Sequence, residues 1–211
     1  AMHIQIIKSG KFGFFIMLLI LLPLCGNIDY VLGLWLVDVP AHTANFVVLV
    51  LLYSLLDGIL TPIAIGVFAQ GEIKAYEIAL CIIYAVNFIA SYVCLKLGMA
   101  PETVFVLNIA FKACVLADLL VHSKAKYAFP VHAFLKQCLL PSAVVFVLSG
   151  AFTYFMPWET PNSFWEFLLH TLAIIICTSL MALAIGMTKG ERLFLKKNLR
   201  DKITVKLYRK I

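Results

Sequence analysis

Charged residues are scarce in this sequence. Asp, Glu, Lys and Arg make up 13% of the 211 residues, whereas 63% are hydrophobic and the mean hydropathy is +1.00. A water-soluble domain of this length has too much surface to cover with so few polar side chains. The composition therefore excludes a soluble globular protein and predicts a protein embedded in a lipid bilayer.

The motifs of metal, nucleotide and covalent chemistry are also missing. The six cysteines show no CxxC or Cys/His spacing, and the five histidines form no HExxH motif. There is no glycine-rich phosphate loop, no paired-carboxylate motif and no nucleophile beside a base. We therefore expect no metal, no cofactor and no enzymatic activity, and we interpret the cysteines as small apolar core residues. The net charge of +6 lies at the ends of apolar segments, so nucleic acid is not an expected partner.

Six apolar segments are candidates to cross a hydrocarbon core of roughly 30 Å, which needs about 20 residues of helix. They are residues 12–26, 44–69, 78–97, 103–121, 134–155 and 164–187. Together they predict an all-α, polytopic membrane domain over residues 1–188. The first segment is short, so we expect its helix to begin nearer Ile4. Residues 28–39 are apolar but too few to return across the bilayer, and they predict an interfacial helix.

The basic residues indicate one orientation of these helices. With a cytoplasmic N-terminus, all of the 17 Lys and Arg except Lys96 and Lys112 fall on the cytoplasmic side, as the positive-inside rule requires. All three tryptophans then lie at the outer boundary, where amphipathic rings are favoured. The sequence thus predicts a multi-pass protein with both termini cytoplasmic.

Residues 189–211 differ from the rest of the chain. Leu195, Leu199, Ile203, Leu207 and Ile211 recur at four-residue spacing among Lys and Arg. This pattern predicts a basic amphipathic cytoplasmic tail that lies on anionic lipid. A simple topology anchor is the main interpretation, and partner binding is the alternative.

Ionisable residues inside the spans are the first candidates for function, because a charge in hydrocarbon needs a polar cavity or a partner. Lys112 lies near the middle of its span, too deep to reach the surface easily. We expect it to face a water-filled cavity, where its cation would attract an anionic group such as phosphate. The structural alternative is a lysine paired with Asp57 or with carbonyls of another helix.

Asp57 lies beside Gly58 and five residues before Pro62 in the second span. Glycine and proline weaken the backbone hydrogen-bond ladder, so Gly58 and Pro62 predict a hinge, and Asp57 with freed carbonyls predicts an ion site. Asn87 and Asn108 also lie mid-span. We place them in the candidate cavity, with hydrogen bonding across helices as the alternative.

Six short motifs, in order along nearly the whole chain, resemble a known transporter family. They are GKFGFF at 10–15, VLGLWLVDVP at 31–40, AQGEIKAYEI at 69–78, NFIASYVCLKLGMAPETVFVL at 87–107, FPVHAFLKQCLLP at 129–141 and IGMTKGERLFL at 185–195. This set resembles the C-terminal half of bacterial polysaccharide (O-antigen) flippases of the multidrug/oligosaccharidyl-lipid/polysaccharide exporter superfamily. One departure is Gln70, where the family has threonine.

The resemblance implies most of the C-terminal lobe of a MATE-like two-lobe transporter, so the chain would be a fragment lacking the N-terminal lobe. It implies flipping of undecaprenyl-diphosphate-linked oligosaccharide across the bacterial inner (plasma) membrane, for O-antigen, lipopolysaccharide or capsule synthesis. Lys112 would contribute to the cavity between lobes. The energy source would be a gradient of H+ or Na+, and glycosyltransferases or a polymerase are candidate partners.

Other functions fit the same residues. One is a membrane enzyme of polysaccharide biosynthesis, which predicts a polar cluster with an acid or a histidine at one membrane face. Another is a scaffold that recruits glycosyltransferases through the basic tail. A third is a multidrug antiporter of the same superfamily, although a central Lys112 disfavours the organic cations that such proteins carry.

Overall fold

The computed structural model describes residues 2–71, 73–155, 161–188 and 190–193, and it contains no strand within these ranges. Its helices are α1 (Met2–Gly26), α2 (Ile28–Trp35), α3 (Thr43–Phe68), α4 (Ile73–Lys96), α5 (Glu102–Tyr127), α6 (Val131–Phe134), α7 (Leu140–Phe155) and α8 (Phe164–Met181). Two π-helical turns, η1 (Leu135–Leu139) and η2 (Ala182–Gly186), precede α7 and follow α8. The prediction of an all-α polytopic membrane protein is confirmed, because six helices in the described residues are long and apolar enough to span a bilayer.

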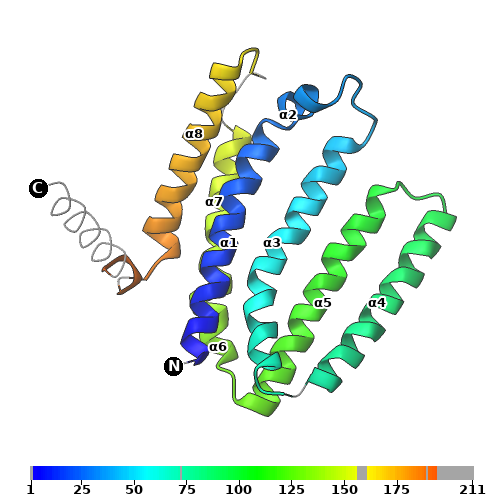
Figure 1. Cartoon of the computed structure of the whole chain (residues 1–211), viewed down its shortest axis with the longest axis vertical. Coiled ribbons are helices and arrows are strands. Elements are labelled where there is room, and N and C mark those ends of the chain that lie inside the picture. Colours follow the sequence, from blue (N-terminus) through cyan, green and yellow to red (C-terminus); the bar gives the residue numbers. More distant parts are fainter. Residues whose placement is uncertain (1, 72, 156–160, 189, 194–211) are drawn as a thin grey trace, which may run out of the picture.

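The spanning helices are arranged as a fan (Figure 1), in which α8, α1, α3, α5 and α4 follow one another and α7 lies behind α1. Helix α1 is central, since it packs against α3, α7 and α8. The apolar core lies where α1, α3, α5 and α7 meet, and its fully buried members include Leu18, Ile59, Leu119 and Val145. Helix α4 is mostly exposed and is held chiefly by α5.

The first spanning helix begins at Met2, ten residues before the predicted segment 12–26. The longer helix has the length that a bilayer requires. Lys11, which the sequence placed in a cytoplasmic segment outside the span, therefore lies inside α1 and is buried. Helix α2 occupies most of the predicted segment 28–39. The predicted basic tail lies outside the described residues except for 190–193.

Small residues bring α1 and α3 together. A Cβ atom added to Gly13 would lie 2.9 Å from the carbonyl oxygen of Gly58, and one added to Gly10 would lie 3.4 Å from the carbonyl oxygen of Ile59. Because glycine has no side chain, membrane helices can approach closely at these residues and gain van der Waals contact. Pro62 has no N–H to donate to the Gly58 carbonyl four residues earlier, so this oxygen is free to point at the partner helix.

Candidate functional site

The predicted intramembrane cation forms an ion pair in the structure. The Nζ atom of Lys112 on α5 lies 2.5 Å from Oδ1 of Asp57 on α3. The same ammonium donates a hydrogen bond of 3.1 Å to the hydroxyl of Tyr53 and lies 4.6 Å from the centroid of the Tyr53 ring. The site therefore follows the alternative in which Lys112 is paired, rather than presenting a free cation.

The helical repeat explains why these groups meet. Tyr53 and Asp57 are four residues apart on α3, so both side chains project from the same face of that helix. Lys112 is ten residues into α5, which places its Cα about 15 Å from the N-terminal end of the helix at 1.5 Å per residue. The pair is thus near mid-depth of a hydrocarbon core of roughly 30 Å.

The two partners differ in exposure. The side chain of Lys112 is 10% exposed, whereas that of Asp57 is 43% exposed. The carboxylate is therefore the outward half of the pair, with the ammonium behind it. Mutual neutralisation lowers the cost of holding two charges at this depth, but a half-exposed carboxylate facing acyl chains would remain costly.

A second polar contact continues the site along α4 and α5. The side-chain amide of Asn87 donates a hydrogen bond of 2.6 Å to Oδ1 of Asn108, and the hydroxyl of Ser91 lies 3.4 Å from Oδ1 of Asn87. Asn108 is one turn from Lys112 on α5, and Tyr84 on α4 lies close to Tyr53 and Lys112. Asp57, Asn87, Asn108 and Lys112 are thus brought into one cluster, which we name the mid-membrane site with Tyr53 and Tyr84.

The two predicted hinge residues lie elsewhere on α3. Gly58 contacts Gly13 at the crossing with α1, so its missing side chain has a packing role. Pro62 lines an open groove of about 320 Å³ between α1 and α3, together with Gln5 and Ser9. Whether α3 bends at these positions stays a prediction.

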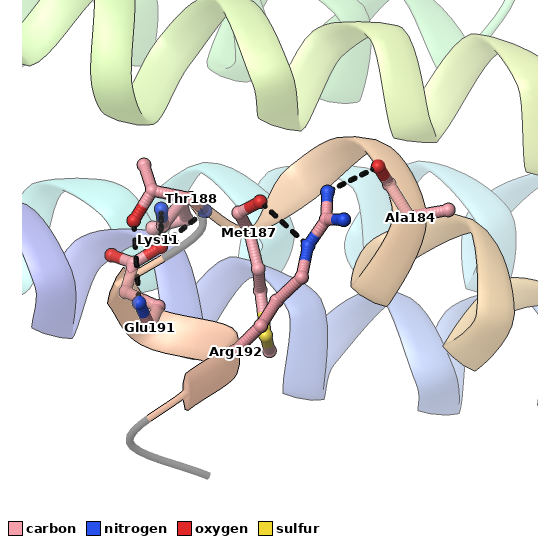
Figure 2. A network of polar contacts seen from close by, with 6 residues as sticks. All are labelled: Lys11, Ala184, Met187, Thr188, Glu191 and Arg192. Carbon is pink, nitrogen blue, oxygen red and sulfur yellow. Dashed lines mark hydrogen bonds and ion pairs between the residues drawn. The ribbon is translucent and has the colours of Figure 1, made fainter. Parts of the chain in front are cut away.

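A buried polar network at the end of the last span was not predicted (Figure 2). The Nζ atom of Lys11 on α1 lies 2.5 Å from Oε2 of Glu191, and their side chains are only 1% and 8% exposed. The partners are 180 residues apart in the sequence. This pair ties the segment after η2 to the middle of α1.

Glu191 also belongs to a reciprocal helix cap. Its carboxylate accepts a hydrogen bond of 2.8 Å from the backbone N–H of Thr188, and its own N–H lies 3.5 Å from the Thr188 hydroxyl oxygen. This is the capping-box pattern of Thr-x-x-Glu. Burial raises the pKa of the Glu191 carboxyl, but the hydrogen bond and charge of Lys11 and the Thr188 N–H outweigh burial and hold that pKa below its usual value.

Arg192 completes the network (Figure 2). Its guanidinium donates hydrogen bonds to the carbonyls of Ala184, at 2.5 Å, and Met187, at 3.1 Å. The end of a helix leaves carbonyls without donors, and a cation there satisfies them. The letters TKGE at 188–191 contain the capping signature, so the cap was visible in the sequence, whereas its Lys11 partner was not.

A further polar cluster joins the N-terminal ends of α3 and α5. Glu102 accepts hydrogen bonds from Asn45, at 3.2 Å, and from Nδ1 of His42. His42 is exposed and has a left-handed backbone with φ of 70°. No group of three or more His, Cys, Asp or Glu in the described ranges has the geometry to hold a metal ion.

Comparisons with protein-family models, with curated proteins and with solved structures give no match for this chain. Its function is therefore argued from its own residues and from the motif resemblance described above.

Proposed function

We propose that this chain is the C-terminal lobe of a transporter that flips undecaprenyl-diphosphate-linked oligosaccharide across the bacterial inner membrane. The observation that carries the proposal is the ion pair of Lys112 and Asp57 at mid-depth, surrounded by Tyr53, Tyr84 and the Asn87–Asn108 contact. Buried ionisable groups in a membrane helix are typical of a substrate or ion pathway. A cation beside hydroxyl and amide groups suits a diphosphate linked to sugars.

The exposure of Asp57 supports a second lobe. Its side chain is 43% exposed at a depth where contact with lipid is unfavourable, so water or another protein segment is expected to cover it. An N-terminal lobe facing this site would enclose a polar cavity, and rocking of the two lobes would expose the cavity to each leaflet in turn. A proton or Na+ acting on Asp57 would supply the coupling.

The direct test is translocation by this chain joined to the N-terminal half of its parent in proteoliposomes. A fluorescent, short-chain diphosphate-linked sugar is added, and its transfer is followed by protection from an external quencher. Lys112→Gln should abolish transfer, whereas Lys96→Gln, which removes an exposed charge at the end of α4, should leave it unchanged. Full activity of Lys112→Gln would remove the mid-membrane site from the mechanism.

The proposed orientation has its own test. If both termini are cytoplasmic, the loop that follows α5 is cytoplasmic and the loop before α3 is periplasmic. A cysteine at Lys124 should then react with a membrane-impermeant maleimide only after the cell is opened, and one at Asp38 should react in intact spheroplasts. The reverse labelling pattern would place both termini on the periplasmic side, and the proposed direction of transport would then be reversed.

A second candidate is a membrane enzyme of polysaccharide biosynthesis, which the cluster of His42, Asn45 and Glu102 favours. A carboxylate bonded to a histidine orients the ring, as in a general base. Under this alternative, His42→Gln should abolish turnover of a lipid-linked sugar by the purified chain. Translocation that persists in His42→Gln, with no turnover in the parent, would leave the transporter as the better explanation.

A further inference from the structure

We infer that Asp57 is a built-in competitor for the anion that Lys112 binds, so that the mid-membrane site admits a phosphate only when Asp57 releases the ammonium. This inference rests on the proposed function, because it concerns the regulation of the same site. It follows from a count of hydrogen-bond donors, from the order of exposure and from charge balance.

The ammonium of Lys112 has three N–H donors and no acceptor. One points to Asp57 at 2.5 Å and one to Tyr53 at 3.1 Å. Two of its three donors are thus committed, and its side chain is only 10% exposed, with the more exposed Asp57 on its open side. A phosphate oxygen can therefore reach this cation only by replacing a partner that is already bound.

Asp57 is the partner that an anion would replace. Tyr53 and Tyr84 are neutral hydroxyl groups, whereas Asp57 is an anion of the same sign as phosphate and lies on the exposed side of the pair. Two anions beside one cation would repel each other strongly at this depth, because the local dielectric is low. The charges favour exchange over simultaneous binding.

Charge balance defines how the exchange proceeds. The site is neutral with Lys112 and ionised Asp57, and it is again neutral with Lys112, one phosphate charge and protonated Asp57. Replacement of Asp57 by one phosphate charge is therefore expected to be accompanied by uptake of one proton at Asp57, and the second phosphate charge of a diphosphate is not neutralised by this pair. In the part of the chain that the structure describes, Asp57 faces Lys112, and the titratable groups beside that ammonium are Tyr53 and Tyr84, while the buried cation on the neighbouring α1, Lys11, is paired with Glu191.

The test measures binding of P1,P2-dimethyl diphosphate to the full chain in lipid nanodiscs by calorimetry. This diester resembles the diphosphate linkage, and its charge stays constant over the pH range in which carboxylates titrate. Asp57→Asn should bind it about tenfold more tightly than the wild type or better, because the competitor is gone. Wild-type affinity should rise as the pH is lowered, and the affinity of Asp57→Asn should not depend on pH.

Two controls separate the possible failures. Glu166→Gln removes an exposed carboxylate at the start of α8, away from the mid-membrane site, and should bind like the wild type. Lys112→Gln should lose binding in both the wild-type and the Asp57→Asn backgrounds. Equal affinity of Asp57→Asn and wild type, with binding still lost in Lys112→Gln, would overturn the competitor but leave the proposed anion site. Unchanged affinity in Lys112→Gln would instead remove that site.

The pH series of the wild type requires no substitution, so it decides the case if Asp57→Asn fails to fold. An affinity that does not change with pH would overturn the exchange. The number of protons taken up per diphosphate, measured in two buffers of different ionisation enthalpy, provides an independent readout, and a value of zero would have the same consequence.

Discussion

Replacing Glu191 with glutamine should destabilise the protein more than loss of any other carboxylate outside the mid-membrane site. The substitution leaves the ammonium of Lys11, which is 1% exposed, without its 2.5 Å partner. Glutamine keeps a carbonyl oxygen that can accept from the Thr188 N–H, so the cap is preserved. The experiment therefore isolates the ion pair.

The magnitude follows from the geometry. At 2.5 Å and an effective dielectric constant of about 20, the attraction between the two charges is about 7 kcal/mol before desolvation is subtracted. Burial of both ions offsets a large part of this, whereas removing one partner leaves the other charge buried and typically costs about 3–5 kcal/mol. We expect Glu191→Gln to fall in that range, and the double variant Lys11→Met/Glu191→Gln to return to within about 1 kcal/mol of the wild type.

The assay is unfolding of the full chain in mixed micelles of increasing SDS content, followed by circular dichroism. Glu166→Gln is the matched control, because Glu166 also caps a helix start, with its N–H 3.4 Å from the Ser163 hydroxyl oxygen and its carboxylate accepting from the Asn162 N–H, but at an exposed position without a buried cation. It should change the free energy of unfolding by less than about 0.5 kcal/mol. A Glu191→Gln effect no larger than that of Glu166→Gln would refute the reasoning.

The same pair has a defined pH dependence. The folded protein holds the pKa of Glu191 below its usual value, which is about 4.3. Its contribution to stability is therefore complete above that usual value and is lost as the pH falls through the lower, folded-state pKa. Glu191→Gln should lack this acid-dependent loss, and an identical acid profile in both proteins would contradict the assignment.

Three further substitutions test the packing and the polar contacts in the same unfolding assay. Gly13→Ala should cost about 1–3 kcal/mol, since its Cβ would lie 2.9 Å from the Gly58 carbonyl oxygen, whereas Gly150→Ala, which meets nothing within 4 Å, should be neutral or slightly stabilising. Asn87→Leu removes the 2.6 Å hydrogen bond across α4 and α5 and should cost about 1 kcal/mol. Arg192→Gln frees two helix-end carbonyls and should cost about 1 kcal/mol. Equal effects of the two alanine substitutions would contradict the close crossing, and no effect of Asn87→Leu or Arg192→Gln would show that water replaces those bonds.

The number and type of the helices were predictable because each apolar segment must satisfy its backbone internally within the bilayer. The residues at which the helices begin and end were less predictable. Hydropathy places Lys11 outside the first span because a lone lysine is unfavourable in hydrocarbon. In the structure Lys11 lies inside α1, which begins at Met2 as the expected start near Ile4 implies, and Glu191 neutralises it.

The sequence predicted which residues belong to the candidate site, but not how their charges are paired. The sequence shows that Lys112 and Asp57 are charges within membrane spans, and it leaves open whether the lysine is free or paired. The relative rotation of α3 and α5 decides that question, by directing Tyr53, Asp57 and Lys112 toward one another. Local spacing carries no information on that rotation.

The sequence by itself determined that this protein crosses a membrane in six helices, because the free energy of burying apolar side chains and backbone depends on composition and length alone. Tertiary structure decided which charges meet: Lys112 with Asp57, and Lys11 with Glu191 across 180 residues. The physical reason is that an ion pair requires two atoms within a few ångströms, and only the packing of separate helices brings these atoms together.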